Sequence, residues 1–453
     1  MNITELLQKY NLWWSNQSYL PAEDALPKRE AFSQLYRNIN NRYFIEGIIG
    51  IRRVGKTTLI RQLIASMIKN GIPRRKILFF SFEEEIVSKN PEILESIIDK
   101  FLSDVQQMPI EKIDSVIYLF FDEIQNIPYW QSVIKKYYDL NHHLKFIVSG
   151  SSSLFLSAVA RESLTGRIFE TIIPPLSFAE FLLIRGLKFD YQKINLLNYD
   201  YLTQISDITG LIPIFSEYLV EGQFPEMINL ENIADKKQYL NNYILGKVLE
   251  YDLPNILKIR YSDSLLSLGK ILIQRSGQLI ELNNLAKEVG IKRQTLARYL
   301  RYLEQSLLVF YIMNKGVGFR ERDRRQRKIY SSSSNFTALM NTDGYLSPNL
   351  NEHIGMIAES YVHQVLKYEY ADFDLFFYRS RDKEVDFILQ KGDTIIPVEV
   401  KYQELIKQGD LKNLTGYMRK KQLKKGFLIT KNLIYNYDLG EGKKIYAVPG
   451  CLL

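Results

Sequence analysis

The fold is decided by the segment Gly50-Ile51-Arg52-Arg53-Val54-Gly55-Lys56-Thr57, which has the GxxxxGK(S/T) pattern of a Walker A phosphate loop. Its glycines let the backbone turn tightly, so that successive N–H groups can point at a phosphate. We expect Lys56 to place its charge near the β- and γ-phosphates and the Thr57 hydroxyl to ligand Mg²⁺. An apolar strand pattern precedes the loop, and a helical pattern begins at Thr58. Because a helix N-terminus favours anions, the residues from Gly50 to Thr58 are predicted to bind a nucleotide.

Strand and helix patterns alternate beyond this loop. Strands are predicted over residues 44–49, 76–82, 116–121, 146–148 and 168–173, and helices over 92–105 and 130–140. The run at 116–121 is wholly apolar, as expected of a central strand in a parallel sheet. The alternation predicts an α/β fold with a parallel sheet covered by helices.

Two acids end the apolar strand Phe120-Phe121-Asp122-Glu123, which is a Walker B pattern. At the end of a strand, Asp122 can hold the Mg²⁺ shell and Glu123 can act as the base that polarises the attacking water. Together the two motifs predict that the nucleotide is ATP and that it is hydrolysed.

Two further positions are candidates at the same site. Ser149 ends the next strand and would lie between the Walker motifs, where it could orient the water or the γ-phosphate; the alternative is a serine-rich turn. Arg167 precedes the fifth strand and could serve as an arginine finger, in its own chain or across a subunit boundary. The alternative for Arg167 is a plain surface arginine.

Composition bounds the class of protein. The chain has 453 residues, too many for one core, and a net charge of +8 that suits either nucleic-acid binding or simple solubility. No apolar run reaches the roughly 18 residues of a membrane span, and no signal core opens the chain, so a cytoplasmic protein without membrane contact is expected. Cys451 is the single cysteine, which excludes disulfide frameworks and cysteine zinc sites within one chain.

A helix-turn-helix pattern covers residues 282–301, with Gly290 at the turn. Its second helix carries Lys292, Arg293 and Arg298 near the end where DNA would be met. The pattern therefore predicts DNA as a partner, although such units also serve as packing modules. A basic run follows and either tracks phosphates or is a solvated linker; it contains Arg320, Arg322, Arg324, Arg325, Arg327 and Lys328. Next, Ser331–Ser334 are predicted to form a loop.

The C-terminal part carries a second constellation. A turn at residues 391–393 predicts a hairpin that brings Asp386 beside Glu399 and Lys401, which face the same side of their strand. Two carboxylates can hold Mg²⁺, and a neighbouring lysine can orient water or stabilise charge on a phosphate. Glu359, on a helix predicted to begin near Gly355, would add a third carboxylate.

These motifs, together with Pro175-Leu176-Ser177 and the segment Gly222-Gln223-Phe224-Pro225-Glu226, resemble an AAA-type ATPase family common in archaea and bacteria. The C-terminal residues resemble the PD-(D/E)xK nuclease superfamily, in a domain of the DUF4143 type. The resemblance implies an AAA+-like P-loop sheet with a helical lid, a winged-helix domain and a restriction-endonuclease-like α/β domain. It implies Glu359, Asp386 and Glu399 as metal ligands and Lys401 as the catalytic lysine. The implied segments are residues 1–40 (N-terminal helices), 41–180 (ATPase core), 181–260 (lid), 261–330 (winged helix) and 331–453 (nuclease-like domain).

The sequence leaves two functions open. In the first, an ATP-hydrolysing protein acts on DNA and carries its own metal-dependent nuclease domain. In the second, ATP switches a DNA-binding protein whose nuclease fold does not cut. A homo-oligomer with a shared ATP site and a monomeric switch are both compatible with Arg167.

Overall fold

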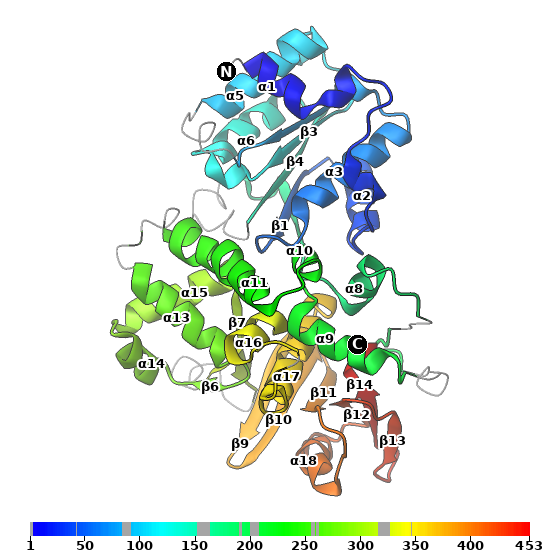
Figure 1. Ribbon diagram of the computed structural model, residues 1–453, viewed down its shortest axis with the longest axis vertical. Helices are drawn as coiled ribbons and strands as arrows, with labels where there is room; N and C mark the ends of the chain where they lie inside the picture. The colour runs from blue at the N-terminus through cyan, green and yellow to red at the C-terminus, as the bar shows by residue number, and fades with distance from the viewer. Residues whose placement is uncertain are drawn as a thin grey trace. The chain divides into compact units, whose positions relative to one another are not determined.

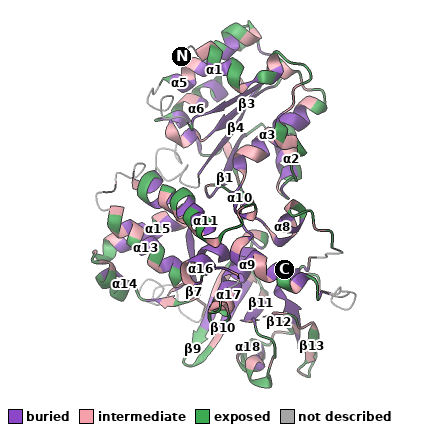
Figure 2. Cartoon of the chain, in the orientation of Figure 1, coloured by how far each residue is buried: buried purple, intermediate pink, exposed green. Residues whose placement is uncertain are grey.

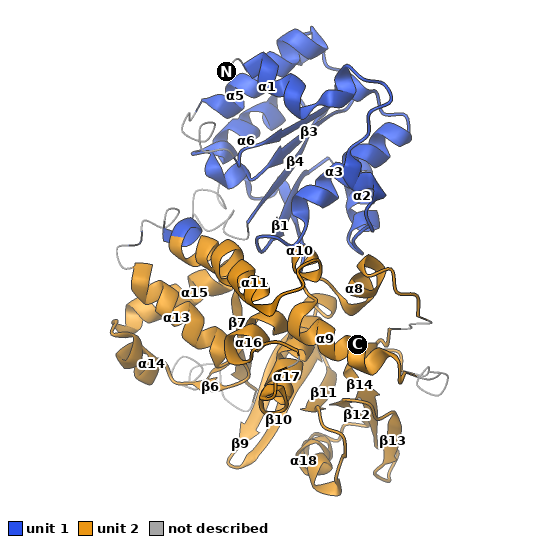
Figure 3. Cartoon of the chain, viewed as in Figure 1, with its two compact units in different colours: residues 1–174, 251–259 blue, residues 175–250, 260–453 orange. Residues whose placement is uncertain are grey.

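The computed structural model describes residues 3–41, 43–83, 92–151, 164–189, 193–199, 208–254, 259, 262–315, 327–345 and 347–453. These residues form two compact units, shown in blue and orange in Figure 3. Unit 1 contains residues 1–174 and 251–259, and unit 2 contains residues 175–250 and 260–453. None of the described helices is long and apolar enough to cross a membrane.

Unit 1 is built on a five-stranded sheet with the order β2-β3-β4-β1-β5, in which all neighbours are parallel (Figure 1). Its strands are β1 (Ile45–Gly50), β2 (Ile77–Ser81), β3 (Ile117–Asp122), β4 (Leu144–Ser151) and β5 (Ile168–Ile172). Its longer helices are α1 (Ile3–Tyr10), α2 (Phe32–Asn41), α3 (Lys56–Lys69), α5 (Ile93–Lys100) and α6 (Trp130–Leu140). The parallel sheet and its five strands, all predicted from the sequence, are confirmed.

The central strands β1, β3 and β4 are buried along their whole lengths, as Figure 2 shows in purple. Continuous burial requires apolar residues at successive positions rather than at alternate ones. This explains why the wholly apolar run before Asp122 was readable as a central strand. The predicted helix at 92–105 begins as α5 and ends in a π-helical turn over Phe101–Gln106.

Unit 2 combines helices with one nine-stranded sheet of order β13-β14-β12-β11-β10-β9-β7-β8-β6. Its strands are β6 (Leu279–Ile280), β7 (Val309–Asn314), β8 (Arg327–Ser331), β9 (Asp374–Ser380), β10 (Lys383–Lys391), β11 (Thr394–Lys401), β12 (Lys425–Thr430), β13 (Tyr435–Asp438) and β14 (Lys444–Pro449). Its helices are α8 (Phe178–Ile184), α9 (Leu211–Glu221), α10 (Pro225–Ile228), α11 (Ile233–Gln238), α13 (Ser262–Gln274), α14 (Leu282–Val289), α15 (Arg293–Gln305), α16 (Ser334–Asn341), α17 (Leu350–Glu369) and α18 (Lys412–Lys421). A π-helical stretch over Tyr239–Asp252 follows α11.

This sheet crosses the boundary expected between residues 330 and 331, which falls inside β8. Strand β7 pairs in parallel with β9 through Met313 and Phe376, so the strands that follow α15 join the C-terminal hairpin in one sheet. The structure groups the chain into two compact units. The finer division into five segments that was expected from the sequence stays a prediction. One smaller expectation also changes, because α17 begins at Leu350 rather than near Gly355.

The loop predicted over Ser331–Ser334 is confirmed only for Ser332 and Ser333, because Ser331 ends β8 and Ser334 begins α16. All four serines are fully buried. Ser333 Oγ donates to Gln223 Oε1 at 2.6 Å, and Ser334 Oγ donates to the Leu219 carbonyl at 2.7 Å. Gln223 is thereby fixed in the core of unit 2.

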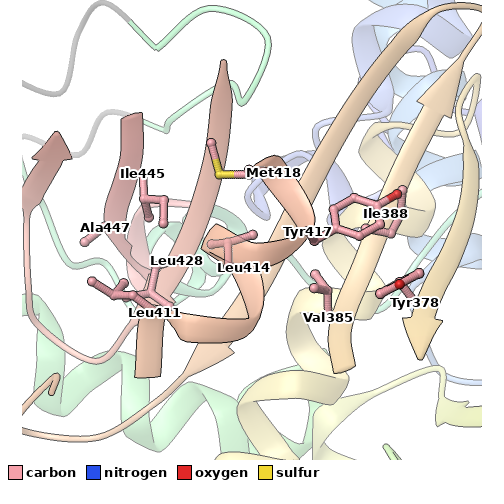
Figure 4. Packing of buried hydrophobic residues seen from close by; sticks show 10 residues of the cluster. All are labelled: Tyr378, Val385, Ile388, Leu411, Leu414, Tyr417, Met418, Leu428, Ile445 and Ala447. Carbon is pink, nitrogen blue, oxygen red and sulfur yellow. The ribbon is translucent and has the colours of Figure 1, made fainter. Parts of the chain in front are cut away.

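The C-terminal part of unit 2 has an apolar core between α18 and the sheet (Figure 4). The helix contributes Leu414, Tyr417 and Met418, which pack against side chains of β10, β12 and β14. This packing supports the hairpin of β10 and β11. The same hairpin carries the predicted site residues Asp386, Glu399 and Lys401.

Candidate functional site

The phosphate loop joins β1 to α3 at the carboxyl edge of the five-stranded sheet. Gly55 has a φ of 92°, a left-handed conformation that favours glycine, and it precedes the first residue of α3. Lys56 is buried, and its ammonium donates to the carbonyls of Gly50 and Ile51, each at 3.1 Å. Burial lowers the pKa of Lys56, and the carboxylates of Glu123 and Asp122 oppose that shift. The loop thus holds a cation at the N-terminus of a helix, as a phosphate site requires.

Asp122 is the centre of the site. Its carboxylate accepts a hydrogen bond from Thr57 Oγ1 at 2.7 Å and another from Ser149 Oγ. Burial raises its pKa to about 6, and the nearby charge of Glu123 adds to the shift. Side chains predicted from three separate motifs therefore meet at one carboxylate.

The topology explains why Ser149 reaches this point. Strand β4 lies between β1 and β3 in the sheet, so its carboxyl end lies between the phosphate loop and Asp122. Ser149 is fully buried and pairs in register with Ile48 of β1. Its predicted place between the two Walker motifs is confirmed, while its role with water or phosphate stays a prediction.

Glu123 follows β3 in a left-handed conformation, with a φ of 53°. Such a conformation costs about 1 kcal/mol or more for a residue with a side chain and tends to occur at functional sites. Gln125 Nε2 donates to Glu123 Oε2 at 2.6 Å and orients the carboxylate. This side chain is only partly buried, so it remains accessible as a base.

Arg167 lies elsewhere. It immediately precedes β5, and because β5 and β1 are parallel with Ile168 beside Ile45, it lies at the edge opposite the phosphate loop. Five strand residues separate the edges, roughly 16 Å at 3.3 Å per residue. Its guanidinium pairs with Asp139 at 3.0 Å. The topology therefore places Arg167 away from the loop of its own chain. The role across a subunit boundary stays a prediction, and so does the alternative of a plain surface arginine.

Two supports of the loop were not found from the sequence. Arg29, from the segment before β1, donates to the carbonyls of Val54 and Pro174. Arg52 makes a two-pronged pair with the buried Asp252, with both N–O distances at 2.7 Å. Arg29 and Asp252 are remote in sequence from the loop and belong to no motif, so nothing local signals these contacts.

The loop residues suit Mg²⁺ together with ATP. The Thr57 hydroxyl and the Asp122 carboxylate are oxygen donors of the kind that Mg²⁺ prefers, and they lie 2.7 Å apart. Arg53 and Val54 complete the loop, and Arg53 is also left-handed at a φ of 68°. The structure brings together all the predicted ATP-site residues except Arg167.

The predicted C-terminal site residues also lie close together, and Lys328, which was not predicted there, lies among them. Asp386 lies at a bulge in β10 and accepts a hydrogen bond from the Val400 N–H at 3.0 Å, while Lys401 Nζ pairs with Glu399 Oε1 at 2.7 Å. The ammonium of Lys328 lies 2.7 Å from Glu359, 2.8 Å from Glu384 and 2.9 Å from Asp386. We call these four acids, Glu359, Glu384, Asp386 and Glu399, the acid cluster.

Burial is the main influence on the pKa values of these acids. Burial and the charge of Asp386 raise the pKa of Glu359 to about 7 and that of Glu399 to about 8. Burial would also raise the pKa of Asp386, but the ammonium groups of Lys328 and Lys401 outweigh it and hold that pKa below its usual value. The four acids face Lys328, Lys401 and Arg379, the last at 3.5 Å from Glu384. Among them, Glu359 and Glu399 are the acids whose raised pKa favours a bound proton.

Mg²⁺ does not fit this arrangement. The Lys328 ammonium contacts one oxygen each of Glu359 and Asp386, the Val400 N–H donates to the other Asp386 oxygen, and Lys401 pairs with Glu399. Within the part of the chain that the structure describes, no group of three or more His, Cys, Asp or Glu side chains is arranged to hold a metal ion. Lys328 was predicted as part of a basic run that is solvated or tracks phosphates; it is instead buried among acids. Residues 320–326 of that run lie outside the described residues.

The predicted helix-turn-helix residues form two helices. Helix α14 ends at Gly290, which has a φ of 74°, and α15 begins at Arg293. Lys292, Arg293 and Arg298 are exposed, whereas Leu296 and Leu300 are buried against the rest of the unit. The start of the second helix therefore carries exposed basic residues, while its winged-helix classification and its DNA contacts stay predictions.

Comparison with known proteins gives three domain matches. Residues 42–182 match a family described as an AAA domain, while residues 212–335 and 354–450 match domains of unknown function, DUF8612 and DUF4143. An uncharacterized protein of Methanocaldococcus jannaschii is 26% identical over 81% of this chain and 77% of its own length. An uncharacterized protein of Haemophilus influenzae is 25% identical over 84% of this chain and 88% of its own.

Among solved structures, a Walker-type ATPase of Pyrococcus abyssi is similar with a TM-score of 0.39 and 15% identity, over 72% of this chain and 99% of that one. The match to the AAA domain covers the residues that form the five-stranded sheet and its phosphate loop. Over residues 42–182 the chain is therefore similar to an AAA domain.

Proposed function

We propose that the protein binds ATP at the phosphate loop of unit 1 and hydrolyses it. The observation that carries this proposal is the meeting of Thr57, Ser149 and Asp122, in which two hydroxyls from different motifs donate to one buried carboxylate. Lys56 supplies positive charge at the N-terminus of α3. A phosphate chain in the loop would lie beside both groups, since each belongs to the carboxyl edge of the sheet.

Each residue has a separate task in this proposal. Thr57 and Asp122 hold Mg²⁺, which neutralises charge on the phosphates when it is bound. Lys56 stabilises the β- and γ-phosphates, and Glu123, held by Gln125, takes the proton of the attacking water. Ser149 orients Asp122 through its hydrogen bond.

The test is phosphate release by the full chain with Mg²⁺ and ATP. Glu123→Gln is expected to keep ATP binding but to lower turnover by about 10²- to 10⁴-fold, the usual contribution of a general base. Lys56→Ala is expected to weaken ATP binding itself. The exposed Glu111 provides a matched control, and Glu111→Gln should turn over ATP like the wild type. Unchanged turnover in Glu123→Gln would remove this residue as the base.

A second proposed function is DNA binding through α15. Its support is the exposure of three basic residues, Lys292, Arg293 and Arg298, at the N-cap and first turns of the helix, where base edges or phosphates are met in helix-turn-helix proteins. The net charge of +8 favours association with a polyanion.

DNA binding is tested by the anisotropy of a labelled duplex at several salt concentrations. Each lost phosphate contact lowers the slope of log affinity against log salt by about 0.9, so Lys292→Ala with Arg298→Ala should flatten it by about 2. Lys412→Ala, on the exposed face of α18, is the control and should leave the slope unchanged. An affinity that does not vary with salt would exclude this function.

Metal-dependent cleavage by the C-terminal part is not included in this proposal. It needs a divalent cation among Glu359, Asp386 and Glu399, and the ammonium of Lys328 lies beside two of these three acids. Of the two functions that the sequence left open, the non-cutting ATP switch is the one we propose.

A further inference from the structure

We infer that Lys328 is the resident cation of the acid cluster and that it excludes a divalent metal ion from it. The ammonium contacts one oxygen each of Glu359, Glu384 and Asp386 at 2.7, 2.8 and 2.9 Å. These three oxygens surround a single point, which is where a metal ion shared by them would also have to lie. Mg²⁺ requires oxygens at about 2.0–2.1 Å, so the ion and the ammonium cannot share that point.

Lys328 is not free to withdraw. Its side chain is 4% exposed, and its backbone lies within β8, between Ile312 of β7 and Leu279 of β6. A buried ammonium that leaves three carboxylates would lose its partners and leave their charges uncompensated, which is strongly unfavourable in a protein interior. The strand and its charge therefore keep the amine in place.

Other groups also bind these acids. Tyr330, two residues after Lys328 on the same strand, donates at 2.7 Å to Glu359 Oε1, the oxygen that Lys328 contacts, and its ring stacks on His363 with centroids 4.4 Å apart. Lys401 pairs with Glu399, and the Val400 N–H donates to Asp386 Oδ2. Each acid of the cluster thus has a partner from the protein itself, without a metal.

This network connects parts of the chain that are far apart in sequence. Lys328 belongs to β8, Glu359 to α17, and Glu384 and Asp386 to β10. It therefore joins the strands that follow the basic helix α15 to the C-terminal hairpin. In this role the acids and lysines fix the packing of unit 2 rather than supply a reaction.

The experiment measures Mn²⁺ bound per full-length chain by equilibrium dialysis. The wild type and Asp386→Asn are expected to bind equal amounts, because the cluster adds no site; any binding at the phosphate loop is common to both. Lys328→Met is expected to gain about one Mn²⁺ per chain, and the gain should disappear in the double variant with Asp386→Asn. Lys401→Met is the matched control. It also removes a lysine of the network, but Lys401 pairs with Glu399 and not with Asp386, so this variant should gain no Mn²⁺.

Two results would overturn the inference. One is a wild type that binds one Mn²⁺ more than Asp386→Asn and more than Glu399→Gln, which would place a metal in the cluster despite Lys328. The other is a folded Lys328→Met that gains no Mn²⁺. If Lys328→Met does not fold, the wild-type comparison with Asp386→Asn and Glu399→Gln decides the question alone.

Discussion

Gly50→Ala tests whether the phosphate loop is held where the structure places it. Gly50 ends β1, and a Cβ there would lie 2.6 Å from the Ile173 carbonyl oxygen and 3.0 Å from Val54 Cγ2. Ordinary contact begins at 3.4 Å, so the end of the strand must move by 3.4 − 2.6 = 0.8 Å. The carbonyl cannot yield easily, because the Ile173 N–H is bonded to the Ile49 carbonyl at 2.6 Å.

A shift of this size acts directly on the loop that would cradle the phosphates. Misplacement of a bound group by about 1 Å can cost on the order of 10²-fold in rate, so we expect ATP turnover to fall by about one to two orders of magnitude. ATP affinity should fall as well, since Lys56 donates to the carbonyl of Gly50 itself.

The assay is a titration with a fluorescent ATP analogue, followed by phosphate release. Gly416→Ala is the matched control: Gly416 lies in α18, is exposed, and a Cβ there would meet nothing within 4 Å. It should leave ATP binding unchanged and stabilise the helix by about 0.5–1 kcal/mol. Gly50→Ala with the affinity and turnover of the wild type would refute the placement of the loop.

Three other predictions follow from the same unit. Since the pKa of Asp122 is raised from 3.8 to about 6 in the folded chain, the wild type without nucleotide should lose stability as pH rises from about 4 to about 6. Urea unfolding of Asp122→Asn should lack this loss, about 3 kcal/mol at most; equal pH profiles would contradict the burial of that charge. Asp252→Asn leaves Arg52 without its buried carboxylate and should cost unit 1 about 3 kcal/mol, measured by the same unfolding assay; no loss would mean that the pair is solvated. If Arg167 acts across a subunit boundary, turnover per chain should rise with protein concentration in the wild type but not in Arg167→Ala, and a rise in both would exclude that role.

Most of the fold and site features that could be predicted come from local sequence patterns. The Walker motifs, the apolar strand before Asp122 and the helix-turn-helix around Gly290 each depend on residues within about twenty positions of one another. Parallel pairing then brings Ser149 to Asp122, because neighbouring strands end at the same edge. These parts of the site follow from sequence order alone.

The missed contacts are those that only distant pairing creates. Lys328 ends a run of basic residues and therefore resembled a solvated segment, but the pairing of β7 with β9 brings its strand beside β10 and the acid cluster. The serine run is a loop only at Ser332 and Ser333, and it is fully buried although short polar runs are usually exposed. Here Gln223 and the Leu219 carbonyl accept hydrogen bonds from Ser333 and Ser334. Neither environment is visible in the neighbouring residues.

The most direct measurement incubates the full chain with Mg²⁺, ATP and supercoiled plasmid in one tube, and follows phosphate release and DNA strand breaks together. The account predicts phosphate release that depends on Glu123 and plasmid that stays uncut, because Asp122 and Thr57 suit a metal ion and the acid cluster holds Lys328 instead. Strand breaks that disappear in Asp386→Asn, or a wild type that releases no phosphate, would contradict it.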